Sequence, residues 1–247
     1  MAFEAISVAI DGGVAAVDLN RPERKNAMTV RMVNELREGL AAWAADDSVG
    51  VIVLGGAGGA FCSGLDLAER NSMSAKEWSE IFGLSRRELH RELYAFDKPV
   101  VCALERYAIN AGSALALACD FMVVGETAYL QVGEVQQGRP AAMNLAWLRL
   151  RFGDAVARRV ALRGDRVLGP ELERLGIAIS CVADSEVRAA AMALSQELAQ
   201  LPPEGTLNTK RALRELQTVP ADGDWFLHAE RITAAMPAPA GPMPRVR

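Results

Sequence analysis

The sequence predicts an α/β fold in which mainly parallel strands alternate with helices. Two observations lead to this prediction. Short, continuous apolar runs of strand length recur at 49–54, 100–104 and 121–125, and segments with helical periodicity separate them. A run that is apolar at every position suits a strand that is buried on both faces, as in a parallel sheet. Strand–helix–strand alternation then favours parallel strands joined by right-handed crossovers.

The first quarter of the chain predicts a hairpin, a helix and a buried strand. A double glycine separates strand-like runs at 5–10 and 14–19, which is typical of a tight hairpin. After a turn, Thr29 is expected to cap a helix that reaches Ala45. The buried run at 49–54 then leads into a glycine-rich loop. The apolar residues of the helix recur on one face and are Met32, Val33, Leu36, Leu40 and Trp43.

The remaining chain predicts helices with short strands between them. The segment 74–96 is amphipathic, and we expect it to form one helix. Small residues around 112–118 suit a helix that packs closely against a neighbour. Further helices are expected near 142–151, 154–162, 170–175, 186–200 and 206–216, and a short strand is expected at 177–182.

Composition argues against several classes of function. The net charge of the 247 residues is −4, so no general basic field attracts nucleic acid or an anionic membrane. The four cysteines form no CxxC pair, and with only His90 and His228 present a zinc site of ordinary spacing is not supported. We also see no signal peptide and no apolar run of membrane-spanning length. We therefore expect a cytoplasmic protein that has buried thiols and binds neither nucleic acid nor membrane.

Three segments could carry chemistry, and the first runs from Ala60 to Leu67. It follows a buried strand and the glycine-rich loop. Gly64 allows the backbone to come close to a ligand and to point an N–H group at it. A tight strand-to-helix turn is the alternative interpretation, and the P-loop pattern is absent.

The second segment, 107–116, opens a helix of small residues after another buried strand. The first N–H groups of a helix lack intrahelical partners, so they can form an anion or oxyanion site. Close packing of the helix on the sheet is the alternative. The third segment, 132–135, places Glu134 among apolar residues. A buried glutamate has a raised pKa and can carry protons. The alternative, which is preferred for this segment taken alone, is a surface glutamate or one that pairs with a nearby arginine.

In this order, these segments resemble the crotonase superfamily, also called the enoyl-CoA hydratase/isomerase family. The likeness covers roughly residues 5–215. It implies an α/β spiral of repeated ββα units with a C-terminal helical region. The matching motifs are NRPERKNAM at 20–28, the block from Val51 to Asp66, DKPVVCAL at 97–104 with Tyr107-Ala108, ACD at 118–120, and the stretches 162–164 and 175–182.

The resemblance implies that the thioester carbonyl of an acyl-coenzyme A lies between the backbone N–H groups of Leu65 and Ala111. Removing the Cα proton of a thioester places negative charge on this oxygen. Each preorganised donor at that point typically contributes about 3–4 kcal/mol to lowering the barrier. Because the donors belong to the backbone, leucine and alanine are compatible with positions where the family has alanine and glycine.

The resemblance also implies that coenzyme A lies across the 20–28 segment and the first oxyanion loop. The candidate contacts are Arg24 for a phosphate, although a solvated surface charge is the alternative, together with Ala27, Ser63, Asp66 and Leu67. Coenzyme A is part of the substrate, so no separate cofactor and no metal are expected.

The proton-transfer groups differ from the family pattern. Hydratases of the family carry two glutamates, and Glu134 matches the second, while Ala114 stands at the position of the first. The segment 138–144 is also shorter and lacks the family's glycines. One glutamate suffices to move a proton from C2 of a 3-enoyl-CoA to C4, so a single-base isomerase is favoured. The alternatives are an enoyl-CoA hydratase, another enolate chemistry such as decarboxylation, and a catalytically weak acyl-CoA-binding or assembly protein.

The resemblance further implies a homotrimer or a dimer of trimers. We expect residues 1–190 to form the core that carries the site, 191–235 to form helices for oligomerisation and pocket closure, and 236–247 to form a Pro-rich tail. Nucleic-acid binding, which a few relatives show, is supported only by a group of arginines. We prefer to interpret these arginines as charges on helix surfaces. The group consists of Arg149, Arg151, Arg158, Arg159, Arg163 and Arg166.

Overall fold

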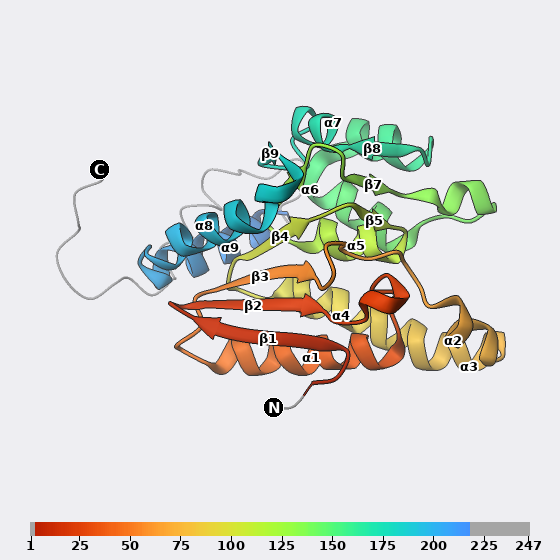
Figure 1. The fold of residues 1–247 in the computed structure, drawn as a ribbon, viewed down its shortest axis with the longest axis horizontal. Coiled ribbons are helices and arrows are strands. Elements are labelled where there is room, and N and C mark those ends of the chain that lie inside the picture. The colour runs from red at the N-terminus through yellow and green to blue at the C-terminus, as the bar shows by residue number, and fades with distance from the viewer. Residues whose placement is uncertain (1–2, 218–247) are drawn as a thin grey trace.

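The computed structural model describes residues 3–217 and shows two sheets surrounded by helices (Figure 1). The larger sheet has the strand order β1-β2-β3-β4-β6-β9, and the smaller one has the order β5-β7-β8. Strands β1 and β2 form the predicted hairpin, and all later neighbours in the larger sheet are parallel. The strands are β1 Ile6–Asp11, β2 Val14–Leu19, β3 Val51–Gly56, β4 Val100–Leu104, β5 Tyr107–Ile109, β6 Phe121–Gly125, β7 Tyr129–Gln131, β8 Arg166–Leu168 and β9 Ser180–Val182.

The chain winds as a spiral of ββα units. A strand of the larger sheet is followed by a short strand of the smaller sheet and then by a helix, as in β4–β5–α5 and β6–β7–α6. The smaller sheet's strands have three residues each, too few to show a period in the sequence, and for this reason they were not predicted. The helices are α1 Val30–Ala45, α2 Leu67–Ser72, α3 Ala75–Trp78, α4 Leu84–Ala95, α5 Ala111–Ala118, α6 Ala142–Ala161, α7 Gly169–Arg174, α8 Val187–Ala199 and α9 Pro203–Leu216.

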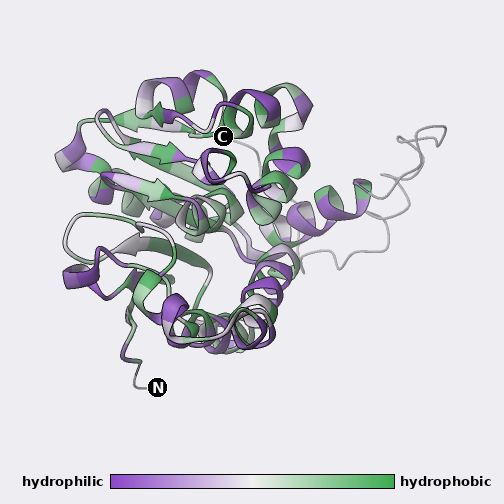
Figure 2. Cartoon of the chain, turned by 90° about the vertical axis from the view of Figure 1, so that its right-hand side faces the viewer, coloured by the Kyte–Doolittle hydropathy of each residue, from purple (hydrophilic) through white to green (hydrophobic). Residues whose placement is uncertain are grey.

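The central strands of the larger sheet are buried on both faces, as their continuous apolar runs predict. Every residue of β3 and β4 is buried. Alternate residues of these strands contribute to two different hydrophobic clusters, one of which also contains Val187 and Ala191 of α8. Helix α8 therefore covers one face of the sheet, and the larger cluster, which includes residues of α1, α4 and α5, covers the other. Figure 2 shows hydrophobic residues gathered in the strands and hydrophilic ones along the outer faces of the helices.

The predicted helix boundaries hold at the N-terminus but not over 74–96. Thr29 caps α1, its side chain accepting a hydrogen bond from Met32 N at 3.2 Å, and α1 ends at Ala45 as expected. The segment 74–96 is not one α-helix, because a π-helical turn at Ser79–Gly83 separates α3 from α4. The ring of Trp78, at the end of α3, stacks on that of Phe82 in this turn, with centroids 4.2 Å apart. The two helices expected at 142–151 and 154–162 are confirmed as the two arms of α6, which non-helical backbone at Gly153 (φ 78°, ψ 176°) separates.

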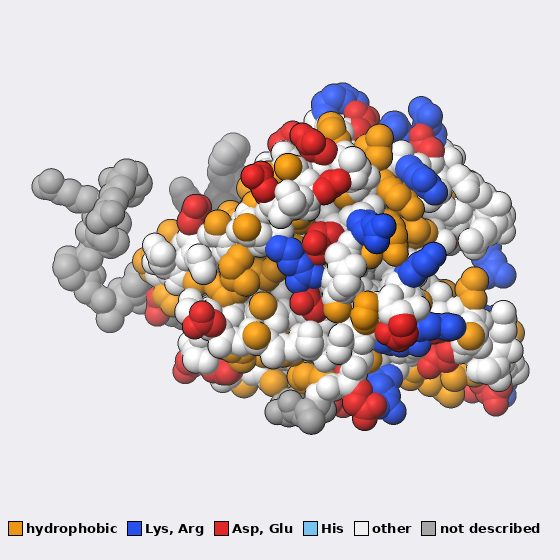
Figure 3. Space-filling model, in the orientation of Figure 1, with side chains coloured by type: hydrophobic (Ala, Val, Ile, Leu, Met, Phe, Trp, Pro, Cys, Tyr) orange, Lys and Arg blue, Asp and Glu red, His pale blue; other side chains and the backbone are white. Residues whose placement is uncertain are grey.

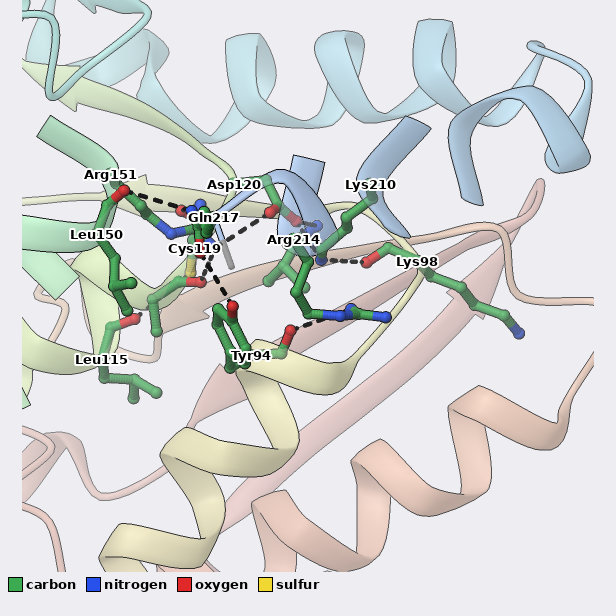
Figure 4. Close-up of polar contacts among 12 residues, drawn as sticks. Tyr94, Lys98, Leu115, Cys119, Asp120, Leu150, Arg151, Lys210, Arg214 and Gln217 are labelled. Carbon is green, nitrogen blue, oxygen red and sulfur yellow. Dashed lines mark hydrogen bonds and ion pairs between the residues drawn. The ribbon is translucent and has the colours of Figure 1, made fainter. Parts of the chain in front are cut away.

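Helix α9 is fixed to the core by ion pairs with two aspartates, Asp120 and Asp97, and Figure 4 shows the first of them. Asp120, just before β6, accepts hydrogen bonds from Lys210 Nζ at 2.6 Å and from Arg151 at 3.2 Å. Asp97 pairs with Arg211 and with Arg214, the latter at 2.9 Å. Helices α8 and α9 lie at the positions where the sequence predicted helices near 186–200 and 206–216. The expected 222–235 helix, His228 and the tail at 236–247 lie outside the described residues.

The surface carries acidic and basic side chains in mixture (Figure 3). Most of the arginines considered above for nucleic-acid binding have partners. Arg151 pairs with Asp120, Arg158 with Asp154, and both Arg159 and Arg163 with Asp165, while Arg166 lies 4.5 Å from the ring centre of Tyr129. Within residues 3–217, no helix is long and apolar enough to cross a membrane, and no group of three metal-binding side chains occurs.

Candidate active site

The two loops expected to bind the thioester lie against each other. Cys62 bridges Ala108 of β5, and Ile109 N donates a hydrogen bond to Cys62 O at 3.0 Å. The loop after β3 therefore runs beside β5 and beside the start of α5. A Cβ atom on Gly112 would lie 2.6 Å from Cys62 O, so only glycine permits this approach. Leu65 and Ala111 follow directly on the two contacting segments.

The N–H groups of Leu65 and Ala111 are available for a ligand. Within the described chain, neither group donates a hydrogen bond to the backbone or to a side chain. Ala111 is the first residue of α5, where the N–H group has no intrahelical partner. Leu65 is fixed on both sides, because Met28 N donates to Gly64 O and Asp66 N donates to Met28 O. Two fixed, unused donors on adjacent loops are the arrangement required of an oxyanion site.

Gly112→Ala tests this arrangement. The added methyl group must push α5 away from the Cys62 carbonyl, so it displaces the Ala111 N–H relative to that of Leu65. A displacement near 1 Å is expected to lower kcat about 100-fold, with a modest loss of stability from overpacking. Gly205→Ala in α9 is the control, because no atom lies within 4 Å of its Cβ position. Equal kcat values for the two variants would contradict the assignment.

Asn110 connects the oxyanion segment to the segment that carries Glu134. Its backbone has a φ of 52°, which is uncommon for a residue other than glycine. Its side-chain Oδ1 accepts a hydrogen bond from Gly133 N at 2.8 Å, and its own N–H donates to Gln131 O at 2.8 Å. The 3₁₀ helix Gly133–Gln137 is therefore held next to the start of α5.

Glu134 lies half-buried at the start of this 3₁₀ helix. Its Oε1 accepts a hydrogen bond from Asn144 Nδ2 at 3.1 Å. Asn144 in turn is fixed by Asn110 O at 3.0 Å and by the Ser113 hydroxyl at 3.0 Å. The second oxygen, Oε2, is buried and has no hydrogen-bond partner. One carboxylate oxygen thus positions the side chain, and the other is free to exchange a proton.

The surroundings raise the pKa of Glu134 above 4.5. Burial is the main cause, and hydrogen bonds from Asn144 and from its own backbone, together with the charge of Arg86, oppose the shift. A carboxyl group with a raised pKa holds a proton more readily near neutral pH, as acid–base catalysis requires. Ala114, at the position of the other expected acid, lies on α5 and is 1% exposed, so a buried methyl group occupies that place.

The candidate coenzyme A contacts gather at the edge formed by the 20–28 and 62–67 segments. Ser63 N donates to Lys25 O at 3.1 Å, which joins the two segments. Arg24 is half-exposed, and its guanidinium lies 3.7 Å from the Asp66 carboxylate. Leu67 is exposed, whereas Ala27 is buried. Asp66 is itself 4% exposed, pairs with Arg21 at 2.9 Å and caps α2, so its side chain stabilises the loop.

Sequence reasoning missed several polar residues around the site. Asn26 is fully buried and donates to the carbonyl groups of Ala57 and Ala60, which fixes the glycine-rich loop. Asn110 and Asn144 position Glu134, and Arg86 interacts with it electrostatically. A polar residue on the apolar face of a predicted helix, as at Asn144, was the one signal available in the sequence.

The chain matches known proteins over most of its length. The family model described as enoyl-CoA hydratase/isomerase matches residues 9–222. The 2,3-dehydroadipyl-CoA hydratase of Escherichia coli is 31% identical over 207 residues, which cover 83% of this chain and 80% of that protein. The 1,2-epoxyphenylacetyl-CoA isomerase of the same organism is 30% identical over 221 residues, covering 87% and 84%. An enoyl-CoA hydratase structure from Bacillus anthracis superimposes with a TM-score of 0.86 at 24% identity, covering 94% and 90%.

The ββα spiral and these matches define a protein of the crotonase fold class. The chain belongs to the enoyl-CoA hydratase/isomerase family and is an enzyme of lyase or isomerase type. The resemblance inferred from its motifs is thereby confirmed.

Proposed function

We propose that this enzyme binds an acyl-CoA thioester, stabilises its enolate and isomerises a 3-enoyl-CoA to the 2-enoyl isomer with one proton-carrying group. The thioester oxygen accepts hydrogen bonds from Leu65 N–H and Ala111 N–H. Glu134 removes a proton from C2, and the negative charge moves to the thioester oxygen. Glu134 then returns the proton to C4 while the double bond shifts to C2=C3. No atom is gained or lost.

The proposal rests on the presence of one glutamate, Glu134, together with a buried alanine, Ala114, at the position of the family's other glutamate. Hydration needs a water molecule that is both held and activated, a task that two carboxylates share in the hydratases this sequence resembles. In this chain the methyl group of Ala114 takes the place of the first carboxylate, and it neither binds water nor moves a proton. A 1,3-proton shift needs no water, so a single acid–base group is sufficient.

Side-by-side assays with 3-enoyl-CoA and 2-enoyl-CoA substrates test this function. We expect turnover of the 3-enoyl ester to exceed hydration of the 2-enoyl ester by at least about 100-fold, the usual contribution of one acid–base group. Isomerisation is followed by chromatographic separation of the 3-enoyl and 2-enoyl esters, which have equal mass, and hydration by mass spectrometry, since it adds the mass of water. Hydration as fast as isomerisation would support the hydratase alternative. Binding without turnover of any ester would support an acyl-CoA-binding or assembly role.

We further propose that coenzyme A binds along the 20–28 and 62–67 segments, with Arg24 near a phosphate. A trimer-based assembly and a cytoplasmic location complete the proposal. The open groove between α4 and α6, of about 640 Å³ and lined by Tyr94, Met143, Trp147 and Leu150 among others, is an apolar surface that such an assembly could cover. Light scattering coupled to size-exclusion chromatography measures the assembly state.

A further inference from the structure

Three buried polar atoms without a hydrogen-bond partner occur in the described chain: Arg86 Nε, His90 Nε2 and Glu134 Oε2. Leaving a buried donor or acceptor unpaired is costly, so native structures contain few such atoms. Proton transfer explains the free oxygen of Glu134. The proposed reaction assigns no role to the two free donors on α4, Arg86 Nε and His90 Nε2.

These three side chains belong to one region of the molecule. Arg86 and His90 are one helical turn apart on α4, so they lie on the same face of that helix. His90 Nδ1 accepts a hydrogen bond from Trp147 Nε1 at 2.9 Å, and Asn144, on the preceding turn of α6, donates to Glu134. The inner face of α6 therefore touches both His90 and Glu134. The charge of Arg86 acts on both of these residues.

His90 has one ring nitrogen, Nε2, that is buried without a hydrogen-bond partner. The residue is 5% exposed. Burial, and secondarily the charge of Arg86, lowers its pKa to about 3, so the ring is neutral near pH 7. Because Nδ1 accepts a hydrogen bond from Trp147, the single ring proton resides on Nε2. His90 Nε2–H is therefore a fixed donor with no acceptor.

Arg86 adds a positive charge without an ion-pair partner. Its guanidinium makes no ion pair or hydrogen bond with residues 3–217 and lies 5.8 Å from the ring centre of Phe82. Burial lowers its pKa, and the charge of Glu134 opposes the shift. The side chain is partly exposed, but its buried Nε–H group loses hydration without gaining a partner. A planar guanidinium suits a carboxylate better than any neutral oxygen.

We propose that Arg86 and His90 bind a carboxylate carried by the acyl chain beside Glu134, so that the substrates are thioesters of dicarboxylic acids. This inference rests on the proposed function, because Glu134 marks where the reacting carbons lie. Arg86 supplies the positive charge and a donor, and His90 supplies a second donor. The carboxylate satisfies both free donors and neutralises the charge.

Binding measurements with unreactive saturated esters test the subsite without requiring turnover. Succinyl-, glutaryl- and adipoyl-CoA are compared by calorimetry with butyryl-, pentanoyl- and hexanoyl-CoA, which have the same numbers of acyl carbons. The full chain is expected to bind at least one carboxylated ester about 10- to 100-fold more tightly than its uncharged counterpart, as a charged hydrogen bond implies. Arg86→Met should reduce this ratio to about one.

Arg87→Met is the matched control. It removes the same charge from the next residue of α4, but the Arg87 side chain is 57% exposed and pairs with Glu88 at 3.7 Å. The preference should persist in this variant. Arg86→Gln, which keeps a polar side chain, provides a second variant if Arg86→Met does not fold. Thermal unfolding of each variant checks the fold.

Three outcomes would overturn the subsite. The first is the absence of a carboxylate preference at every chain length, and the second is an equal preference in the Arg86→Met and Arg87→Met variants. If Arg86 instead only tunes Glu134, Arg86→Met would lower kcat equally for charged and uncharged enoyl esters and would shift the pH profile, which also overturns the proposal. A carboxylate preference without isomerase activity would contradict the proposed reaction while leaving the subsite intact.

Discussion

Glu134→Gln is expected to lower kcat for the enoyl-CoA reaction by about 10²–10⁴-fold, the range typical of one acid–base group. Glutamine keeps the shape of the side chain and can still accept the hydrogen bond from Asn144, but it cannot take up a proton at neutral pH. Because the proposed hydrogen bonds to the thioester oxygen come from Leu65 and Ala111 and not from Glu134, binding of an acyl-CoA should change little. Single-turnover rates and calorimetric binding, measured on the same preparation, separate the two effects.

The pH profile gives a second readout of Glu134. Burial raises its pKa above 4.5, and the base form is present only above that raised pKa. The rate should therefore rise with pH through a region above 4.5, and this acidic limb should vanish in Glu134→Gln. Glu197→Gln, on the exposed face of α8, is the control and should keep the wild-type profile. Wild-type turnover in Glu134→Gln would remove Glu134 from the mechanism.

Asp120→Ala should have the largest effect on stability. Asp120 accepts hydrogen bonds from Lys210, from Arg151 and from Val100 N at 2.9 Å (Figure 4). Its side chain is 17% exposed, and that of Lys210 is 16% exposed. Removing the carboxylate leaves two largely buried cations and a backbone donor with fewer partners. The expected loss is about 3 kcal/mol, or roughly 6–12 °C in Tm for a domain of this size.

Two further variants identify the cause of that loss. In Asp120→Ala combined with Lys210→Met, the unpaired ammonium group is absent, so part of the stability should return. Asp154→Ala, which removes the exposed partner of Arg158 on α6, should change the free energy of unfolding by less than about 1 kcal/mol. If Asp120→Ala were no more destabilising than Asp154→Ala, the ion pairs of Asp120 would not fix α9.

The sequence predicted elements wherever burial imposes a periodic pattern. The β1–β2 hairpin, the largely buried strands β4 and β6, and α1 with its cap at Thr29 all lie where the pattern placed them. Motifs with a fixed order also indicated the family. They depend on local backbone geometry, as at Gly64, whose φ is 103°, and such geometry restricts the residue type directly.

Only the tertiary structure revealed what positions and surrounds Glu134. The hydrogen bonds among Asn110, Ser113, Asn144 and Glu134 join residues up to 34 positions apart, and no local pattern records a contact of that range. The three-residue strands of the smaller sheet were also missing from the sequence pattern, because they pair with strands that are distant in the chain. The sequence by itself determined the family, the two backbone donors and the single glutamate as expectations. The tertiary structure decided which polar groups are left unpaired beside that glutamate, because burial and the absence of a partner are properties of the packed chain.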